Sequence, residues 1–334
     1  MSLNLEFFNR PTNITAKVVC DSVSEQGVRL TTFEIEYPRF IHGELMTHRM
    51  LSKNSSSSRA IPIQKMLEQI ESNMAIPIYW GKNKSGMQAV EEVNDLSKKN
   101  AEIMWKECFW KAKDTASWLC DDGLHKQVPN RPTEPFQMMK VVVTGTDWDN
   151  FLNLRIHPDA QPEICMLAYK IYKAMEWSYP VKLKAGDWHL PYVGFEYWGD
   201  DPKYFITKVS KDDDQSYGMK YEEYLSLEDA IKISASCCAQ VSYRNTDMSL
   251  EKADKIFNML IKSDVVHASC FEHLATPIRS QEGLINGWDF GITHQNKSGQ
   301  LFSGNLRGWI SYRQQLQDNT CWKFDFEERM KLFK

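Results

Sequence analysis

Alternating apolar and polar positions near the start of the chain predict a strand that is followed by a short helix. Between Gly27 and Tyr37, apolar side chains alternate with polar ones, which is the spacing of a half-buried strand. Pro38 then occupies a position suited to a first helical turn, and apolar residues follow at helical spacing. Such a helix would place Glu44 and His48 one turn apart on one face.

Apolar periodicity predicts the remaining elements as well. It indicates a short buried strand at 141–143 and helices at 91–120, 159–175, 230–242, 251–261 and 309–315. The first of these helices is amphipathic and stops at a glycine, and we expect its tryptophans Trp110 and Trp118 to pack rather than to act chemically. Residues 185–218 are rich in Gly, Asp and aromatics without a helical period. We therefore expect a connecting region there, with the acidic run 212–214 in a solvated loop.

These elements together indicate an α/β fold (α+β type) in which helices surround an antiparallel-rich sheet. The 334 residues suffice for one large unit or for two lobes, the first at about 1–184 and the second at about 219–334. Contents of 42% hydrophobic and 25% charged residues are ordinary for a soluble protein. No apolar run is long enough for a bilayer and the N-terminus does not look like a secretion signal, so we expect a cytoplasmic protein without a membrane partner.

Charge and cysteine usage restrict the classes of ligand. A net charge of −4 disfavours a general nucleic-acid binder, so local arginines must hold any anionic ligand. The eight cysteines include no C-x-x-C pair, which indicates reduced thiols rather than a disulfide framework or a zinc site. His267 and His273 lie close in sequence with a cysteine and a glutamate between them. Helical geometry would not bring them onto one face, so we expect no metal there.

Residues 47–59, T-H-R-M-L-S-K-N-S-S-S-S-R, have the composition of a phosphate-binding segment. Hydroxyls and backbone N–H groups can surround phosphate oxygens, and an arginine fork can bind two oxygens at once. The alternative is an exposed serine-rich linker.

Arg155 has apolar neighbours and precedes a loop, so it either turns into a cleft or forms a structural salt bridge. Arg131 lies among prolines that restrain the backbone, so it would lose little freedom on binding an anion.

The order H-R-x-x-S-x-N-x-x-S-x-R in residues 48–59 resembles the signature of the flavin-dependent thymidylate synthases, R-H-R-x-x-S-x-N-E-x-S-x-R. Thr47 replaces the leading arginine and Ser55 replaces the glutamate. Arg155, followed by A-Q-P-E-I, and Arg131, in an R-x-x-x-P segment, resemble two further family elements. H-A-S-C-F-E-H at 267–273 resembles H-x-[ST]-P-F-E-H with Cys270 in place of proline, and A-Q-V-S-Y resembles A-R-V-S-Y. The histidine-rich element lies C-terminal to the H-R motif here, which indicates a long, rearranged branch.

The resemblance implies an activity and a set of site residues. It implies conversion of dUMP into dTMP with FAD, NADPH and methylenetetrahydrofolate, by a homotetramer whose sites are shared between subunits. Arg155 would activate the pyrimidine ring. The implied dUMP-binding residues are Glu44, Ser55, Ser57, Arg59, Arg131 and Arg155. The implied flavin-binding residues are Thr47, His48, Arg49, Asn54, Asn150, Ser242, His267, Ser269 and Glu272.

The chemistry agrees with the resemblance and leaves alternatives open. Methylation at carbon 5 needs a nucleophilic ring, and the P-C-H context of the classical cysteine-dependent synthase is absent. Arg155 suits an electrostatic route instead. No G-x-G-x-x-G fingerprint is present, so a Rossmann site is not expected.

Glu44 stands where compact members have glutamine, and a glutamate that only accepts hydrogen bonds favours an amino group such as that of cytosine. Otherwise Glu44 pairs with an arginine or with His48. A sister enzyme that makes another 5-substituted pyrimidine nucleotide and a non-catalytic nucleotide-binding protein remain alternatives.

Overall fold

A five-stranded sheet forms the centre of the molecule. The structure is a computed structural model that describes residues 5–57, 59–86, 91–209, 220–241, 246–262, 266–279 and 288–333. Neighbouring strands in this main sheet are antiparallel except for one parallel pair, β1 with β5. In spatial order the strands are β3 (Ser52–Ser55), β4 (Met138–Gly145), β2 (Arg29–Pro38), β1 (Thr15–Ser24) and β5 (Val181–Leu183).

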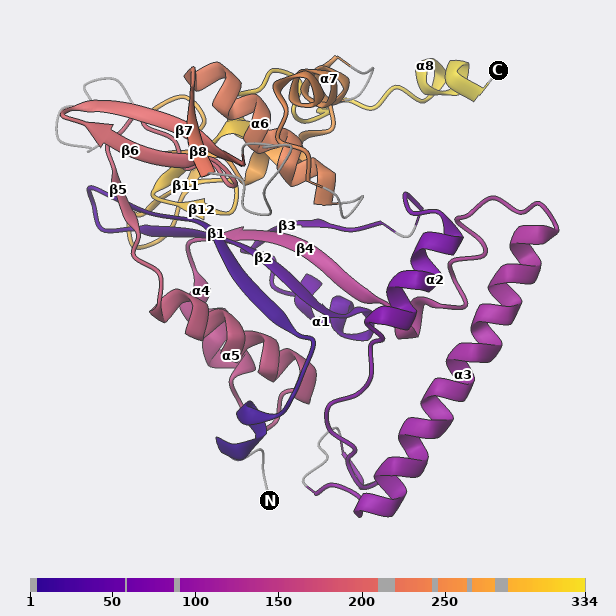
Figure 1. Ribbon diagram of the computed structural model, residues 1–334. Helices are drawn as coiled ribbons and strands as arrows, with labels where there is room; N and C mark the ends of the chain where they lie inside the picture. The colour runs from indigo at the N-terminus through magenta and orange to yellow at the C-terminus, as the bar shows by residue number, and fades with distance from the viewer. Residues whose placement is uncertain are drawn as a thin grey trace.

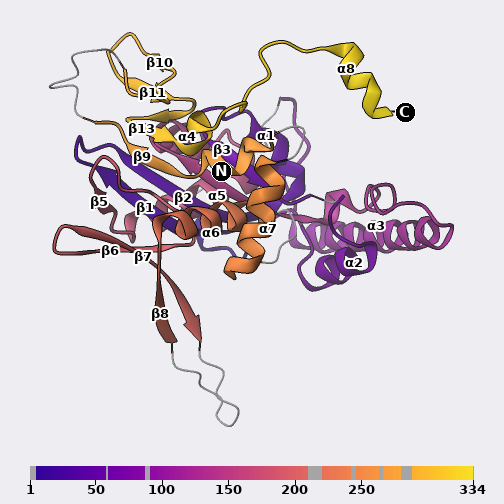
Figure 2. The same cartoon turned by 90° about the horizontal axis from the view of Figure 1, so that it is seen from above.

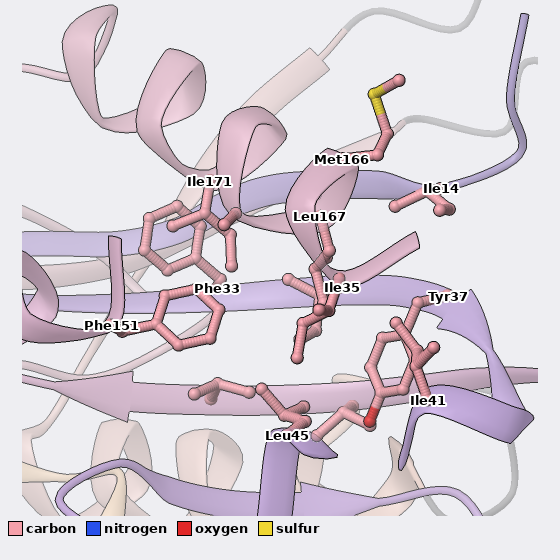
Figure 3. Close-up of a cluster of buried hydrophobic side chains, with 14 of the residues drawn as sticks. Ile14, Phe33, Ile35, Tyr37, Ile41, Leu45, Phe151, Met166, Leu167 and Ile171 are labelled. Carbon is pink, nitrogen blue, oxygen red and sulfur yellow. The ribbon is translucent and has the colours of Figure 1, made fainter. Parts of the chain in front are cut away.

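Helices cover both faces of the main sheet, as Figure 1 shows. On one face lie α4 (Trp148–Arg155) and α5 (Pro162–Glu176), and on the other lie α6 (Leu227–Gln240) and α7 (Leu250–Ile261). Side chains alternate across β4 accordingly, because Val141 and Val143 join the core under α5 whereas Val142 joins the core under α6. Figure 3 shows part of the first core, where β2, α4 and α5 bring together apolar side chains such as Phe33, Phe151 and Leu167.

The remaining elements complete the fold. An antiparallel sheet contains β6 (Gly194–Trp198), β7 (Asp201–Val209) and β8 (Lys220–Leu225). Short strands near the C-terminus are β9 (Ala275–Pro277), β10 (His294–Gln295), β11 (Leu301–Ser303), β12 (Leu306–Arg307) and β13 (Trp309–Ser311). The other α-helices are α1 (His42–Met46), α2 (Ile63–Ser72), α3 (Asp95–Asp121) and α8 (Phe326–Met330). The 3₁₀ helices are η1 (Leu5–Asn9), η2 (Arg39–Ile41), η3 (Glu134–Phe136), η5 (Ala268–Glu272), η6 (Tyr312–Gln315) and η7 (Lys331–Phe333).

The expected mixed α/β architecture with an antiparallel-rich sheet is confirmed. Apolar alternation correctly predicted β2, and helical periodicity correctly predicted α3, α5, α6 and α7. The glycine stop of α3 is also confirmed, because Gly123 has φ +85° just beyond the end of the helix. Among the described residues, no helix combines the length and the apolar content that a bilayer crossing requires.

Four local predictions are wrong. Ser52–Ser55 is a strand rather than a loop, because its backbone pairs with β4. Residues 185–218 are more than a connection, since β6 and β7 pair there, with Phe195 opposite Tyr204 and Glu196 opposite Lys203. The run 212–214 lies outside the described residues. Residues 309–315 form a strand and a 3₁₀ turn instead of one helix. The expected packing is wrong for Trp118, which is 63% exposed, whereas the half-exposed Trp110 contacts the Phe109 ring with centroids 5.2 Å apart.

The N-terminus of α3 gives a simple test of the fold. Asn94 caps this helix, and its side-chain oxygen accepts a hydrogen bond from the Ser97 backbone N–H at 2.8 Å. Asn94→Ala is expected to lower the free energy of unfolding by about 1 kcal/mol, because that N–H loses its partner. Urea denaturation measures the change. Asn100→Ala, at an exposed position inside the same helix, is the matched control and is expected to change stability by less than about 0.5 kcal/mol. Equal effects of the two changes would contradict the capping role.

Candidate active site

Arg155 joins the H-R motif through three side chains. It is the last residue of α4, and its Nε donates to Nε2 of His48 at 2.7 Å. One terminal nitrogen donates to Oε2 of Glu44 at 3.2 Å, and the other donates to Oγ1 of Thr47 at 3.3 Å. Each of these two nitrogens carries a second N–H, for which the described residues provide no partner. The guanidinium is therefore fixed in orientation and still has donors for a ligand.

His48 is held in its neutral form. Burial, followed by the nearby Arg155 and Lys53 cations, lowers the pKa of His48 to about 4. Its Nε2 can therefore accept the hydrogen bond from Arg155 near neutral pH. Phe151, one turn before Arg155 on α4, meets the imidazole ring edge to face with ring centroids 4.8 Å apart. Packing and hydrogen bonding thus set the position of the same histidine.

A cleft of about 760 Å³ opens beside this cluster. Its walls include the aromatic rings of Phe40, Tyr79 and Trp105, and Glu44 and Arg155 line it together with the loop that leads into α5. Glu163 at the start of α5 also lines the cleft and is almost fully buried. Burial raises the pKa of Glu163, and its carboxylate accepts hydrogen bonds from the Ile78 backbone N–H and the Gln161 amide. The cleft therefore offers flat apolar walls with acceptors and one fixed cation.

A second group of the expected site residues gathers where β3 ends. Ser57 Oγ accepts from the Arg59 backbone N–H at 3.3 Å in a tight turn. The loop before η3 holds this turn, because Lys126 Nζ donates to the Ala60 carbonyl at 3.0 Å and an asparagine amide donates to the next carbonyl. That loop carries Arg131, which is exposed and pairs with Glu134 at 2.8 Å. Arg59 is exposed and has no salt bridge within the described residues. The Ser57 turn and the Arg131 loop thus lie together.

A third group lies along β3 and η5, which run side by side. In β3, the Asn54 amide donates to the Cys238 carbonyl of α6 at 3.2 Å. In and beside η5, His267 and Ser269 are exposed, and neither side chain has a polar partner among the described residues. Glu272 instead forms a salt bridge with Arg313. The H-R segment therefore reaches Arg155 at one end and the histidine-rich element at the other.

The other expected site residues are less tightly placed. Arg49 is exposed beside His48, and the described part of the chain gives its side chain no ion-pair partner. Asn150 is exposed on the first turn of α4. Ser55 is half-buried in β3 and pairs with Val141 in the main sheet. Ser242 lies outside the described residues.

Comparison with known proteins identifies the segment that contains the first two groups. Residues 21–181 match the family model described as "Thymidylate synthase complementing protein". The match covers a little less than half of the chain, and it shows that residues 21–181 are similar to this family. The family segment thus includes the H-R motif, Arg131 and Arg155, whereas η5 and Arg313 lie beyond it.

Two solved structures resemble the chain more weakly. Both are of a UMP/dUMP methylase, PolB from Streptomyces cacaoi, one bound with 5-Br UMP and the other with 5-Br dUMP. Each is 16% identical and covers 49% of this chain and 90% of its own chain, with TM-scores of 0.42 and 0.40. No curated protein matches the chain.

Sequence reasoning missed several side chains around the family motifs. Lys53 lies inside the H-R motif, and burial lowers its pKa to about 8, with Glu272 opposing that effect. Its amine donates to the Leu51 carbonyl at 2.7 Å and also to the His48 carbonyl. Arg313 follows no recognisable pattern, so only the fold reveals its pairing with Glu272. Lys53 is half-buried, and both carbonyls that accept from its amine lie within five residues of it, so they belong to the H-R motif itself.

A buried hydrogen-bond chain connects the main sheet to η5. Thr32 of β2 and Thr144 of β4 face each other, with their hydroxyl oxygens 2.6 Å apart. Thr32 also contacts Nε2 of His189 at 2.8 Å, and Thr144 contacts Nδ1 of His273 at 2.8 Å. Nδ1 of His189 reaches the hydroxyl of Ser22 in β1 at 2.9 Å. All five side chains are buried, so this polar chain fixes the end of η5 against the sheet.

Proposed function

We propose that this protein is a flavin-dependent thymidylate synthase that converts dUMP into dTMP, with methylenetetrahydrofolate as carbon donor and NADPH as reductant. The contact between His48 and Arg155 carries the proposal, because it joins the two motifs that most resemble this family at the mouth of one cleft. The family match over residues 21–181 supports the same activity class, a methyltransferase-like enzyme that acts on nucleotides.

Arg155 would bind and polarise the pyrimidine. Its two remaining N–H groups can donate to a ring carbonyl, and the three contacts to Glu44, Thr47 and His48 keep the guanidinium from reorienting. A fixed cation stabilises the negative charge that develops when the ring becomes nucleophilic at carbon 5. No cysteine is needed for this step, since positive charge takes the place of covalent addition.

The nucleotide phosphate would lie at the turn after β3. Ser57 offers a hydroxyl, and Arg59 and Arg131 offer exposed guanidinium groups on two loops that are bonded together. Arg131 already shares Glu134 with Arg39, so two arginines face one carboxylate and a local positive charge remains. A phosphate dianion would be attracted to that charge.

The exposed donors of the third group, together with Arg49, fit a flavin. Arg49, His267 and Ser269 are exposed, and the described residues leave their side chains without hydrogen-bond partners. Such groups can hold the polar edge of an isoalloxazine or its phosphates, and the flavin when bound supplies the hydride. These donors lie on the surface rather than in a closed pocket. A homotetramer with shared sites, in which a neighbouring copy covers this surface, is therefore part of the proposal.

A related activity on a cytosine nucleotide is the second candidate. Glu44 lines the cleft and accepts from Arg155 through Oε2, whereas Oε1 has no partner within the described residues. A carboxylate oxygen in this position can accept a hydrogen bond from an exocyclic amino group. Glu44 also orients Arg155 by pairing with it, and that role does not depend on which pyrimidine base is bound.

An absorbance spectrum of the purified protein tests the proposal. We expect a flavin spectrum that NADPH bleaches under anaerobic conditions, and we expect dUMP to change the rate of bleaching. Substituting dCMP for dUMP separates the two candidate substrates. A colourless protein that does not oxidise NADPH after addition of FAD would overturn the proposal and favour a non-catalytic nucleotide-binding protein.

A further inference from the structure

Residues 77–79 separate the cleft beside Arg155 from a second cavity. They belong to the chain between α2 and α3, and Figures 1 and 2 both show these two helices together at one side of the molecule. Pro77 lines the cleft and also the second cavity, which has a volume of about 460 Å³. Ile78 lines the second cavity, whereas Tyr79 lines the cleft. Successive side chains therefore face opposite cavities, and the tyrosine faces the cleft.

Polar contacts hold the backbone on both sides of this tyrosine. The Ile78 backbone N–H donates to Oε1 of Glu163 at 2.9 Å, and the Ile78 carbonyl accepts from Nη1 of Arg10 at 3.0 Å. On the other side, the Trp80 backbone N–H donates to Oε1 of Glu92 at 3.2 Å. Arg10 and Glu92 are themselves joined by two hydrogen bonds, at 2.8 and 2.6 Å. The position of the tyrosine is therefore fixed by contacts before and after it.

One side of the Tyr79 ring is supported from within the chain. The Arg10 guanidinium lies 5.4 Å from the ring centroid, and Phe7 meets the ring edge to face with centroids 6.4 Å apart. Neither Arg10 nor Phe7 lines the cleft. Among the described residues, the ring has no further aromatic or cationic contact, and its hydroxyl has no hydrogen-bond partner. The part of the ring that lines the cleft therefore remains for a ligand.

Two other aromatic residues line the cleft, and both use their rings for packing. The Phe40 and Trp105 rings meet edge to face with centroids 6.2 Å apart, and Trp105 also meets Phe136 at 5.4 Å. The Trp105 indole N–H donates to the Ala75 carbonyl at 2.9 Å. The two rings that line the cleft thus contact each other, whereas both ring neighbours of Tyr79 lie outside the cleft lining. Tyr79 is therefore the ring that leaves its cleft side open.

Tyr79 and Arg155 border the same cleft, and two carboxylates connect them. Glu44 accepts from Arg155 at 3.2 Å. Glu163 holds the Ile78 N–H and lies near Glu44, because burial is the main cause of the raised pKa of Glu163 and the charge of Glu44 also raises it. The donors of Arg155 suit the edge of a flat ligand, whereas an aromatic ring suits its face. The two side chains can therefore bind one ligand.

We propose that Tyr79 stacks on the pyrimidine ring whose carbonyl Arg155 binds, and that Arg10 supports the tyrosine from the side away from the cleft. This inference rests on the proposed function, because it takes a pyrimidine nucleotide as the ligand. A base held only through its edge is free to tilt within a cleft of about 760 Å³, whereas stacking fixes the plane of the ring. Every base has a π-face, so Tyr79 strengthens binding of uracil and cytosine nucleotides alike.

Proton NMR of dUMP in the presence of the protein tests the inference. Stacking against an aromatic face is expected to shift the resonance of the uracil H6 proton upfield. We expect Tyr79→Leu to remove most of this shift and to weaken dUMP binding by about tenfold, since the aromatic face is lost. Tyr79→Phe keeps that face, so we expect the same shift and a dissociation constant within about twofold of the original. Tyr179→Leu, at a position that is 90% exposed, is the matched control and should change neither quantity.

A second measurement uses only the conservative variant, because Tyr79→Leu also removes part of the cleft wall. In protein whose phenylalanines are deuterated, we expect a nuclear Overhauser effect between H6 of bound dUMP and tyrosine ring protons. The same effect should be absent in deuterated Tyr79→Phe. Its absence in the wild type, or its persistence in Tyr79→Phe, would overturn the inference.

The remaining outcomes separate this inference from the proposed function. Bound dUMP whose H6 shift and affinity are the same in Tyr79→Leu as in the wild type would contradict the inference and leave the proposed function standing. Loss of the shift in Tyr79→Phe would contradict it as well, because the hydroxyl rather than the ring face would then be required. A folded wild-type chain that binds neither dUMP nor dCMP would overturn both. Circular dichroism of each variant checks that weaker binding does not reflect loss of the fold.

Discussion

Arg155→Ala is expected to abolish nucleotide methylation while bound flavin is retained. The guanidinium is oriented by three side chains and still has donors for a ligand, so its loss removes the proposed source of ring polarisation. Removing a single fixed donor of this kind typically lowers turnover by about 100-fold to 1,000-fold, and we expect a loss at the upper end because the charge disappears too. Single-turnover product formation, measured on a flavin-loaded sample, checks this result.

Two further readouts distinguish lost chemistry from lost structure. Arg155→Lys keeps the positive charge but not the planar fork, so we expect activity between those of the wild type and the alanine variant. Burial is the main cause of the low pKa of His48, and Arg155 is the next cause. The pKa of His48 should therefore rise from about 4 in Arg155→Ala, which a proton NMR titration can measure. Unchanged turnover in Arg155→Ala would remove this residue from the mechanism.

Acidification is expected to destabilise the protein steeply through His189 and His273. Burial lowers the pKa of each to about 3, whereas an unfolded histidine titrates near 6.5. Between these two values the unfolded state binds more protons than the native state, so the free energy of unfolding falls as pH falls. Each histidine contributes about 1.4 kcal/mol per pH unit well inside this window, so the pair contributes about 2.8 kcal/mol per unit.

Urea denaturation at a series of pH values between 6 and 4 measures that slope. Carboxylates also titrate between pH 6 and pH 4. The test is therefore the difference in slope between a variant and the wild type, rather than the slope of the wild type alone. We expect His273→Gln to make the slope shallower by about 1.4 kcal/mol per pH unit, whatever its effect on stability at neutral pH. His125→Gln, at an exposed position, is the matched control for the replacement of a histidine. Equal slopes in the wild type and in His273→Gln would show that this histidine does not stay neutral in the fold.

The parts of the fold that could be predicted are those whose signal lies within one element. The alternation that predicted β2 and the periodicity that predicted α5 can each be read within one element. Ser52–Ser55 has no such signal, because its place at the edge of the main sheet depends on pairing with β4, far along the chain. Strands β6 and β7 were missed for a similar reason, since aromatic residues occupy both of their faces and hide the alternation.

The candidate site likewise has residues that the sequence predicted and contacts that only the fold shows. The residue types around Arg155 were recognisable from motifs, but its bonds to Glu44 and His48 depend on how α4 packs beside α1. Both alternatives for Glu44 were open in the sequence, and the fold selects the pairing with an arginine. The contact of His273 with Thr144 could not be predicted, because Thr144 lies in β4, a strand remote in sequence. Motif reasoning therefore found reactive side chains, and tertiary packing supplied the groups that orient them.

The mass of the nucleotide after reaction distinguishes a nucleotide methylase from a protein that only binds nucleotides. The protein, loaded with FAD, is incubated with methylenetetrahydrofolate and NADPH together with dUMP, and with dCMP in a parallel reaction, and the nucleotides are then analysed by mass spectrometry. We expect dUMP to gain one methyl group, this product to require NADPH, and Arg155→Ala not to form it. A flavin-loaded, folded protein that leaves both nucleotides unchanged would contradict the account.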